Sequence, residues 1–142
     1  MLIKYFNDSG KLLNMTGILL SGVGTTVSIF ALTLILSIPL GILIAQARMS
    51  RRWIVSKPVS FYIYIMRSTP LMLQVMFIYF LLPQVLPFKF DRFWAVIFSF
   101  VINYAAYFAE IFRGGILSIP PGQREAAMVL SYSKAQTFFR II

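Results

Sequence analysis

Three long apolar runs, separated by short polar stretches, organise this sequence of 142 residues. They cover about residues 18–47, 59–83 and 93–117, and the remaining stretch, 118–142, is more polar. A helix needs about 20 apolar residues to cross a bilayer core of roughly 30 Å. The pattern therefore predicts an all-α, polytopic transmembrane helical bundle, a single domain over residues 1–142, with three spans and a helical segment after them.

The second run is interrupted by the segment Arg67-Ser68-Thr69-Pro70. A residue before proline is biased away from helix, and Ser or Thr followed by Pro is typical of a helix start. The part after the break, residues 70–82, would measure only about 20 Å as a helix. We therefore predict a bent or interrupted span at these four residues, which a membrane tolerates where the backbone lines a cavity or packs on protein.

Polar side chains on the spans are candidates for a substrate pathway. Asn103, Tyr107 and Glu110 share one face of the third predicted helix, and Gln74 follows the break in the second. An acid inside a span is a functional-site hypothesis by default. Two alternatives stay open: Glu110 pairs with Arg113 near the inner headgroups, and Asn103 makes a helix–helix hydrogen bond, typically worth about 0.6 kcal/mol.

Small residues and helix breakers predict how the spans pack. Ala105 and Ala109 form a small-xxx-small pair that permits close contact between helices. Pro39 and Gly41 predict a kink or a bend near the inner end of the first span.

The composition supports a membrane protein and sets its orientation. Hydrophobic residues make up 59% of the chain and charged residues 12%, whereas soluble domains carry about 25% charge. The net charge of +9 falls in the gaps between apolar runs, so we expect a membrane partner and no nucleic acid. Eight Lys and Arg residues lie after the first and third runs and four on the other side. The positive-inside rule then places the N-terminus outside and residues 118–142 in the cytoplasm.

The residue types exclude most chemistry. The chain has no cysteine and no histidine, and its four acids are Asp8, Asp91, Glu110 and Glu125. Zinc sites, His-based catalysis and a Walker A phosphate loop have no residues to use. We expect no catalytic residue, no metal and no cofactor, so energy for any work must come from a partner.

The last segment predicts a helical hairpin. After Pro120 and Pro121, residues 123–130 contain good helix formers. Ser133 and Gln136 form an S-x-x-Q capping box, which predicts a second helix from Ser133. Taken alone, the hairpin is equally typical of an amphipathic element on anionic lipid.

The stretch GQREAAMVLS resembles the EAA loop of ABC-importer permease subunits. The stretches GVGTTVSIF, RSTPLMLQVMFIY and NYAAYFAEIFRGGILSIPPGQREAA are similar, in the same order, to permeases of the polar (histidine/glutamine/arginine-type) amino-acid uptake family. The likeness covers about residues 17–142. It implies a type I ABC importer permease fold, a multi-pass place in the bacterial inner membrane, and translocation without enzymatic activity of the chain's own.

The resemblance also implies a coupling site and partners. In the family the loop is a coupling helix that docks on a cytoplasmic ABC ATPase, which hydrolyses the ATP. The further partners implied are a second permease subunit, identical or homologous, an extracytoplasmic amino-acid-binding protein, and membrane lipid. Glu125, which we place in the first turn of the helix, where its dipole favours an acid, would anchor the ATPase; alternatively, it is a solvated acid. The full set of coupling residues implied is Gly122, Glu125, Ala126, Ala127 and Ser131.

The sequence departs from the family pattern at two places. Ser131 stands where the family has glycine, which would cost about 1–2 kcal/mol if the residue needs a positive φ. The family continues beyond the loop with two further spans, whereas this sequence ends at Ile142. We therefore expect a C-terminally truncated permease, with a non-transporting membrane scaffold or truncated pseudogene product as the alternative.

Overall fold

The computed structural model describes residues 9–85 and 91–141, with side chains described from residue 15 onward. Lys4, Asp8 and Lys89 lie outside the described residues. The described part is helical and contains no strand, which confirms the all-α prediction. In chain order the elements are α2 (Ser9–Arg48), α3 (Trp53–Ser68), α4 (Leu71–Met76), the π-helical turn η1 (Phe77–Leu81), α5 (Leu82–Val85), α6 (Arg92–Leu117), α7 (Pro121–Val129) and α8 (Lys134–Ile141).

Two of these helices, α2 over Met15–Arg48 and α6, are long and apolar enough to cross a membrane. A third candidate span is a bent pair, because α3 and the helix over Leu71–Val85 meet at 106°. The helix α3 continues through Arg67 and Ser68, so the interruption itself consists of Thr69 and Pro70.

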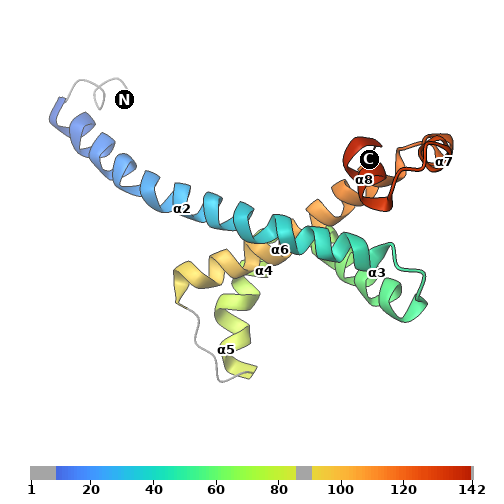
Figure 1. The fold of residues 1–142 in the computed structure, drawn as a ribbon. Coiled ribbons are helices and arrows are strands. Elements are labelled where there is room, and N and C mark those ends of the chain that lie inside the picture. Colours follow the sequence, from blue (N-terminus) through green and yellow to red (C-terminus); the bar gives the residue numbers. More distant parts are fainter. Residues whose placement is uncertain (1–8, 86–90, 142) are drawn as a thin grey trace.

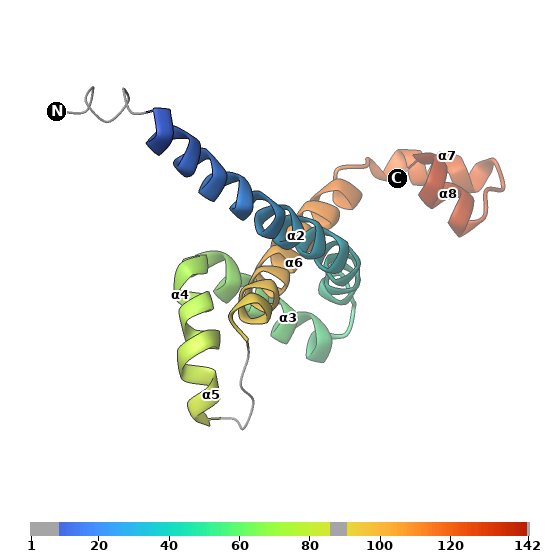
Figure 2. The same cartoon turned by 90° about the vertical axis from the view of Figure 1, so that its left-hand side faces the viewer.

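The long helices α2 and α6 cross near the middle of the molecule (Figures 1 and 2). The helix α3 returns beside the C-terminal part of α2, and the α7–α8 hairpin stands at the C-terminal end of α6. The N-terminal half of α2 extends away from the other helices in both views, and its side chains from Met15 to Ser28 are exposed. The contacts of α2, α3 and α4 with α6 therefore gather around the crossing, and the α7–α8 hairpin lies apart from it.

Small side chains build the crossing. A Cβ added to Gly41 would lie 2.6 Å from the Cβ of Phe108 and 3.3 Å from the carbonyl oxygen of Ala105. Ala105 and Ala109 are fully buried, as the small-xxx-small spacing predicts. The absence of a side chain at Gly41 is thus what allows α2 and α6 to approach each other.

A matching stripe of small residues lies on α2, and the sequence-based prediction did not include it. Thr33, Ser37, Gly41 and Ala45 recur at every fourth position and are all buried. Residues four apart lie on one face of a helix, so this spacing was readable as a packing face. Pro39 and Gly41 do not interrupt α2, which is one helix with Pro39 inside it on the exposed side.

A hydrophobic cluster packs α3 against α2 and α6 beside the crossing. It is formed by Ala45 of α2, Ile63 of α3, and Ala106 and Ala109 of α6. The hydroxyl of Tyr62 in α3 also donates a hydrogen bond to a carbonyl of α6. The break after α3 is thereby held next to the middle of α6.

Candidate functional site

A hydrogen-bonded node joins α6 to the break in the second span. Pro70 has no N–H, so the Met66 carbonyl four residues earlier lacks its helical donor. Asn103 Nδ2 donates to that carbonyl at 2.9 Å and to Gln74 Oε1 at 3.0 Å. Gln74 Nε2 donates to Thr69 Oγ1 at 2.7 Å and reaches the Met66 carbonyl at 3.1 Å. Two amide side chains therefore replace what the proline removed.

The node brings two predicted pathway residues together, Asn103 from α6 and Gln74 from α4. Asn103 is only 4% exposed, and its bonds to Met66 and Gln74 are the helix–helix interaction that the sequence left open as an alternative. Gln74 also lines a largely apolar cavity of about 520 Å³ between α3, α4, η1 and α6. The break is thus held in place from α6 and borders a cavity.

An ion cluster lies farther along α6. Glu110 Oε2 accepts from Arg113 Nη2 at 2.6 Å and from Arg113 Nε at 3.0 Å. The other carboxylate oxygen lies 3.9 Å from Nε of Arg48 at the end of α2. Arg48 Nη1 in turn donates to Ser56 Oγ in α3 at 3.3 Å. Glu110 therefore pairs with Arg113, which is the alternative left open by the sequence, and the cluster links the C-terminal end of α2, the start of α3 and the C-terminal part of α6.

Tyr107, the fourth predicted pathway residue, lies between the node and the ion cluster on α6. Its side chain is 40% exposed, and the guanidinium carbon of Arg67 lies 5.4 Å from its ring centroid. Arg67 in the last turn of α3 therefore contacts α6 through a cation–π interaction. Asn103, Tyr107 and Glu110 follow one side of α6, and Gln74 of α4 bonds to Asn103.

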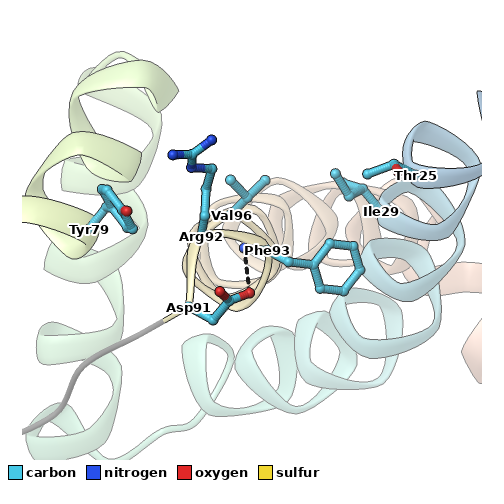
Figure 3. A pocket seen from close by; sticks show the side chains of 7 residues that line it. All are labelled: Thr25, Ile29, Tyr79, Asp91, Arg92, Phe93 and Val96. Carbon is cyan, nitrogen blue, oxygen red and sulfur yellow. Dashed lines mark hydrogen bonds between the residues drawn. The ribbon is translucent and has the colours of Figure 1, made fainter. Parts of the chain in front are cut away.

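A second cavity, of about 550 Å³, lies at the N-terminal end of α6 (Figure 3). The carboxylate of Asp91 accepts a hydrogen bond from the Phe93 N–H at 3.2 Å and so caps α6. The Arg92 side chain points away from this carboxylate. Tyr79 of η1 and Thr25 of α2 line the cavity from either side. Within the described ranges, no group of three or more His, Cys, Asp or Glu side chains is placed to hold a metal ion.

The C-terminal hairpin is closed by two local motifs. The N–H of Tyr132 donates to the Ala127 carbonyl at 2.9 Å and that of Ser131 to the Met128 carbonyl at 3.0 Å. These two bonds form a Schellman motif, whose central residue needs a left-handed conformation, and Ser131 has φ 57°. At the start of α8, Ser133 N–H donates to Gln136 Oε1 at 2.8 Å and Gln136 N–H to Ser133 Oγ at 3.2 Å. The reciprocal pair is the predicted capping box.

The predicted coupling residues differ in accessibility. Gly122, Glu125, Ala126 and Ser131 are exposed, whereas Ala127 is fully buried and offers no surface to a partner. The prediction that Glu125 occupies the first turn of its helix is wrong, because α7 already begins at Pro121. Proline is well tolerated at the first helical position, where no N–H is needed. The helix dipole therefore acts less on Glu125 than the sequence suggested.

A comparison with known families now places this arrangement. The family described as "Binding-protein-dependent transport system inner membrane component" matches residues 37–142. The chain belongs to this family. It is a membrane-embedded component of a transport family, which confirms the resemblance drawn from its motifs.

Individual relatives agree with this assignment. The chain is 37% identical to the octopine transport system permease protein of Rhizobium radiobacter over 132 residues, 87% of this chain and 54% of the relative. It is 40% identical to the arginine transport system permease protein of Bacillus subtilis over 116 residues, 79% and 51% of the two chains. For the glutamine transport system permease protein of Escherichia coli the values are 38% over 126 residues, 88% and 58%.

The fold is also that of a solved transporter. A chain in the crystal structure of an amino acid ABC transporter with histidines superposes with a TM-score of 0.82 at 33% identity, over 93% of this chain and 62% of that chain. The chain described here spans about half the length of the curated relatives named above.

Proposed function

We propose that this chain acts as the transmembrane permease subunit of a binding-protein-dependent ABC importer for polar amino acids. The observation that carries the proposal is the α7–α8 hairpin, which is closed by its own Schellman motif and capping box at the end of the membrane helix α6. The relatives' names, which specify octopine, arginine and glutamine transport, support the substrate class. ATP hydrolysis belongs to a separate subunit in this proposal.

The proposed assembly contains two cytoplasmic ABC ATPase subunits, a second permease subunit and an extracytoplasmic amino-acid-binding protein. The excess of Lys and Arg after α2 and α6 supports an outside N-terminus and a cytoplasmic hairpin. Closure of the ATPase subunits moves α7, and the spans then change from inward-facing to outward-facing. Glu125, Ala126, Gly122 and Ser131 form the docking surface, and buried Ala127 supports it from inside.

In this proposal the candidate pathway residues differ in whether a substrate can reach them directly. Tyr107 and Glu110 keep exposed atoms that a polar amino acid can approach. Asn103 and Gln74 already bond to each other and to the backbone of the broken span, so substrate reaches them only when the node opens. The node would then change together with the bend at Thr69 and Pro70.

Co-purification in detergent tests the coupling role. The chain is expected to capture the ATPase of an amino-acid importer, and Glu125→Ala is expected to lose that capture. Lys134→Ala, which removes another exposed charge from the same hairpin, is the matched control and should retain it. Absence of capture by the unmodified chain would overturn the proposal, and capture without amino-acid uptake would favour the scaffold.

A further inference from the structure

The backbone after α6 cannot supply hydrogen-bond donors for all of the last carbonyls of this helix. The last four carbonyls of an α-helix have no intrahelical donor and need other partners. Here the residues four positions after Ile116 and Leu117 are Pro120 and Pro121, which have no N–H to offer. Either side chains or water must therefore satisfy these carbonyls.

Residues beyond the helix donate to three of its last carbonyls, including that of Ile116. Ser118 donates to the Gly114 carbonyl through its N–H at 2.9 Å and to the Gly115 carbonyl through Oγ at 2.7 Å. Arg124 Nη2 donates to the Ile116 carbonyl at 2.9 Å. Arg124 belongs to α7, so this last bond crosses the whole joint between the membrane helix and the hairpin. A cation at a helix C-terminus is also favoured by the helix dipole.

The Arg124 side chain is held against the protein. It is partly buried, and its Nε is buried with no hydrogen-bond partner in the part of the chain that the structure describes. A buried donor without a partner is costly, so the side chain is placed there at the expense of its own solvation. A surface arginine that only attracted anionic headgroups would keep its guanidinium in water.

The joint itself has few free torsions. Between the last residue of α6 and the first of α7 lie only Ser118, Ile119 and Pro120. Pro120 and Pro121 have their φ angles restricted by the ring, which leaves Ser118 and Ile119 as the flexible positions. The bond from Arg124 to Ile116 spans both of these residues.

We propose that Arg124 is a positioning residue that braces α7 against the end of α6, so that the two helices move as one body. The inference rests on the proposed function in one respect: an ATPase that displaces α7 then also displaces α6, which carries Asn103 and Glu110. Without the brace, rotation at Ser118 and Ile119 absorbs the displacement before it reaches α6.

Distance measurements on the chain test the brace directly. Because the sequence has no cysteine, spin labels at Ile111→Cys on α6 and Val129→Cys on α7 are the only labels, and both positions are well exposed. Pulsed EPR of the detergent-solubilised chain should give a narrow distance distribution. A hydrogen bond from a charged donor biases a two-state joint by roughly tenfold or more, so Arg124→Met should broaden the distribution and Arg124→Lys should restore part of its sharpness.

Lys134→Met removes a charge from the same hairpin without touching the joint, and it should leave the distribution unchanged. An Arg124→Met distribution as narrow as that of the parent, with the same centre, would overturn the brace.

A second label pair tests whether the brace transmits motion. Labels at Tyr64→Cys on α3 and Ile111→Cys on α6 report displacement of α6 inside the complex with the ATPase. ATP should shift this distance in the parent and not in Arg124→Met, although the variant still captures the ATPase. An ATP-dependent shift that survives in Arg124→Met, or a loss of capture, would reject the positioning role. If the parent captures no ATPase, the proposed function fails, and the α6–α7 distances still decide for or against the brace.

Discussion

At two places in this chain a proline removes the donor for the carbonyl four residues before it, and a side chain from another element replaces that donor. Before Pro70, the Met66 carbonyl accepts a hydrogen bond from Asn103, and before Pro120, the Ile116 carbonyl accepts one from Arg124. A carbonyl without a donor is expensive in a membrane, where water is absent. The first replacement joins α6 to the end of α3, and the second joins α7 to α6, so each local defect becomes a contact between two helices.

The node predicts a specific loss of stability. Asn103→Ala should lower the free energy of unfolding by about 1–2 kcal/mol, near the upper end for hydrogen bonds between membrane helices, because it removes both bonds from α6 to the break. Unfolding of the detergent-solubilised chain by a denaturing detergent measures this change. Ser99→Ala is the matched control, since the buried Ser99 hydroxyl donates only within α6, to Ala95. Equal losses in the two variants would contradict the role given to Asn103.

The turn between α7 and α8 predicts a substitution that raises the stability of the hairpin. Ser131 adopts φ 57°, a conformation that disfavours side chains other than glycine. Ser131→Gly should therefore stabilise the hairpin by about 1 kcal/mol, visible as a higher midpoint in thermal unfolding followed by circular dichroism. Ser133→Ala removes the capping box at the next helix and should act in the opposite direction, by about 1 kcal/mol. A lower midpoint for Ser131→Gly would show that the serine makes a compensating contact.

At the scale of elements, the crossing of α2 and α6 depends on surfaces without large side chains. Thr33, Ser37, Gly41 and Ala45 present a nearly flat stripe on α2, and alanines of α6 meet it. In lipid, burial of apolar surface does not drive helices together, so close van der Waals contact of this kind must do so. The large apolar side chains accordingly lie on the outer faces, where bilayer or other subunits can cover them.

The crossing predicts different outcomes for two glycines of the same helix. Gly41→Ala places a Cβ 2.6 Å from the Phe108 Cβ, whereas Gly24→Ala meets no atom within 4 Å. Both changes raise helix propensity equally. The unfolding free energy of Gly41→Ala should therefore fall below that of Gly24→Ala by about 1–3 kcal/mol, the usual cost of overpacking. The two unfolding free energies are measured in a denaturing detergent. Equal values for Gly41→Ala and Gly24→Ala would contradict the close contact at the crossing.

At the scale of the whole molecule, the described helices form an open arrangement rather than a closed bundle (Figure 2). The N-terminal half of α2 makes little contact with the rest, and large side chains such as Phe30 and Phe139 are 64% and 85% exposed. In water such surfaces would favour aggregation. In the proposed assembly, lipid, a second permease subunit and the ATPase cover them.

The orientation gives a whole-molecule prediction. In the proposed orientation, with the N-terminus outside, the end of α5 faces outward and the hairpin faces the cytoplasm. Val85→Cys should react with a membrane-impermeant maleimide in intact spheroplasts, and Phe139→Cys only after permeabilisation, because both positions are exposed on the protein itself. Each variant carries a single thiol, since the chain has no cysteine of its own. Labelling of Phe139→Cys in intact spheroplasts would reverse the orientation inferred from the positive-inside rule.

The sequence by itself determined what depends on neighbours within one or two turns. Apolar runs predicted the membrane helices, Thr69 and Pro70 marked the break, and Ser133 with Gln136 marked the start of α8. The EAA-like loop and the other similar stretches, taken in their order along the chain, predicted the family. These signals are readable because helix formation, capping and proline interruption involve residues a few positions apart.

Only the tertiary structure decided which distant groups meet. Asn103 bonds to Met66 and Gln74, 37 and 29 positions away, and the backbone at Gly41 touches Phe108. The bond from Arg124 to Ile116 likewise depends on how α7 is placed at the end of α6, and Ala127 is buried in the hairpin in which α7 and α8 are in contact. The periodicity of a helix shows which face a residue occupies, but the partner of that face is set by the packing of whole helices, because each side chain reaches only a few ångströms from its own backbone.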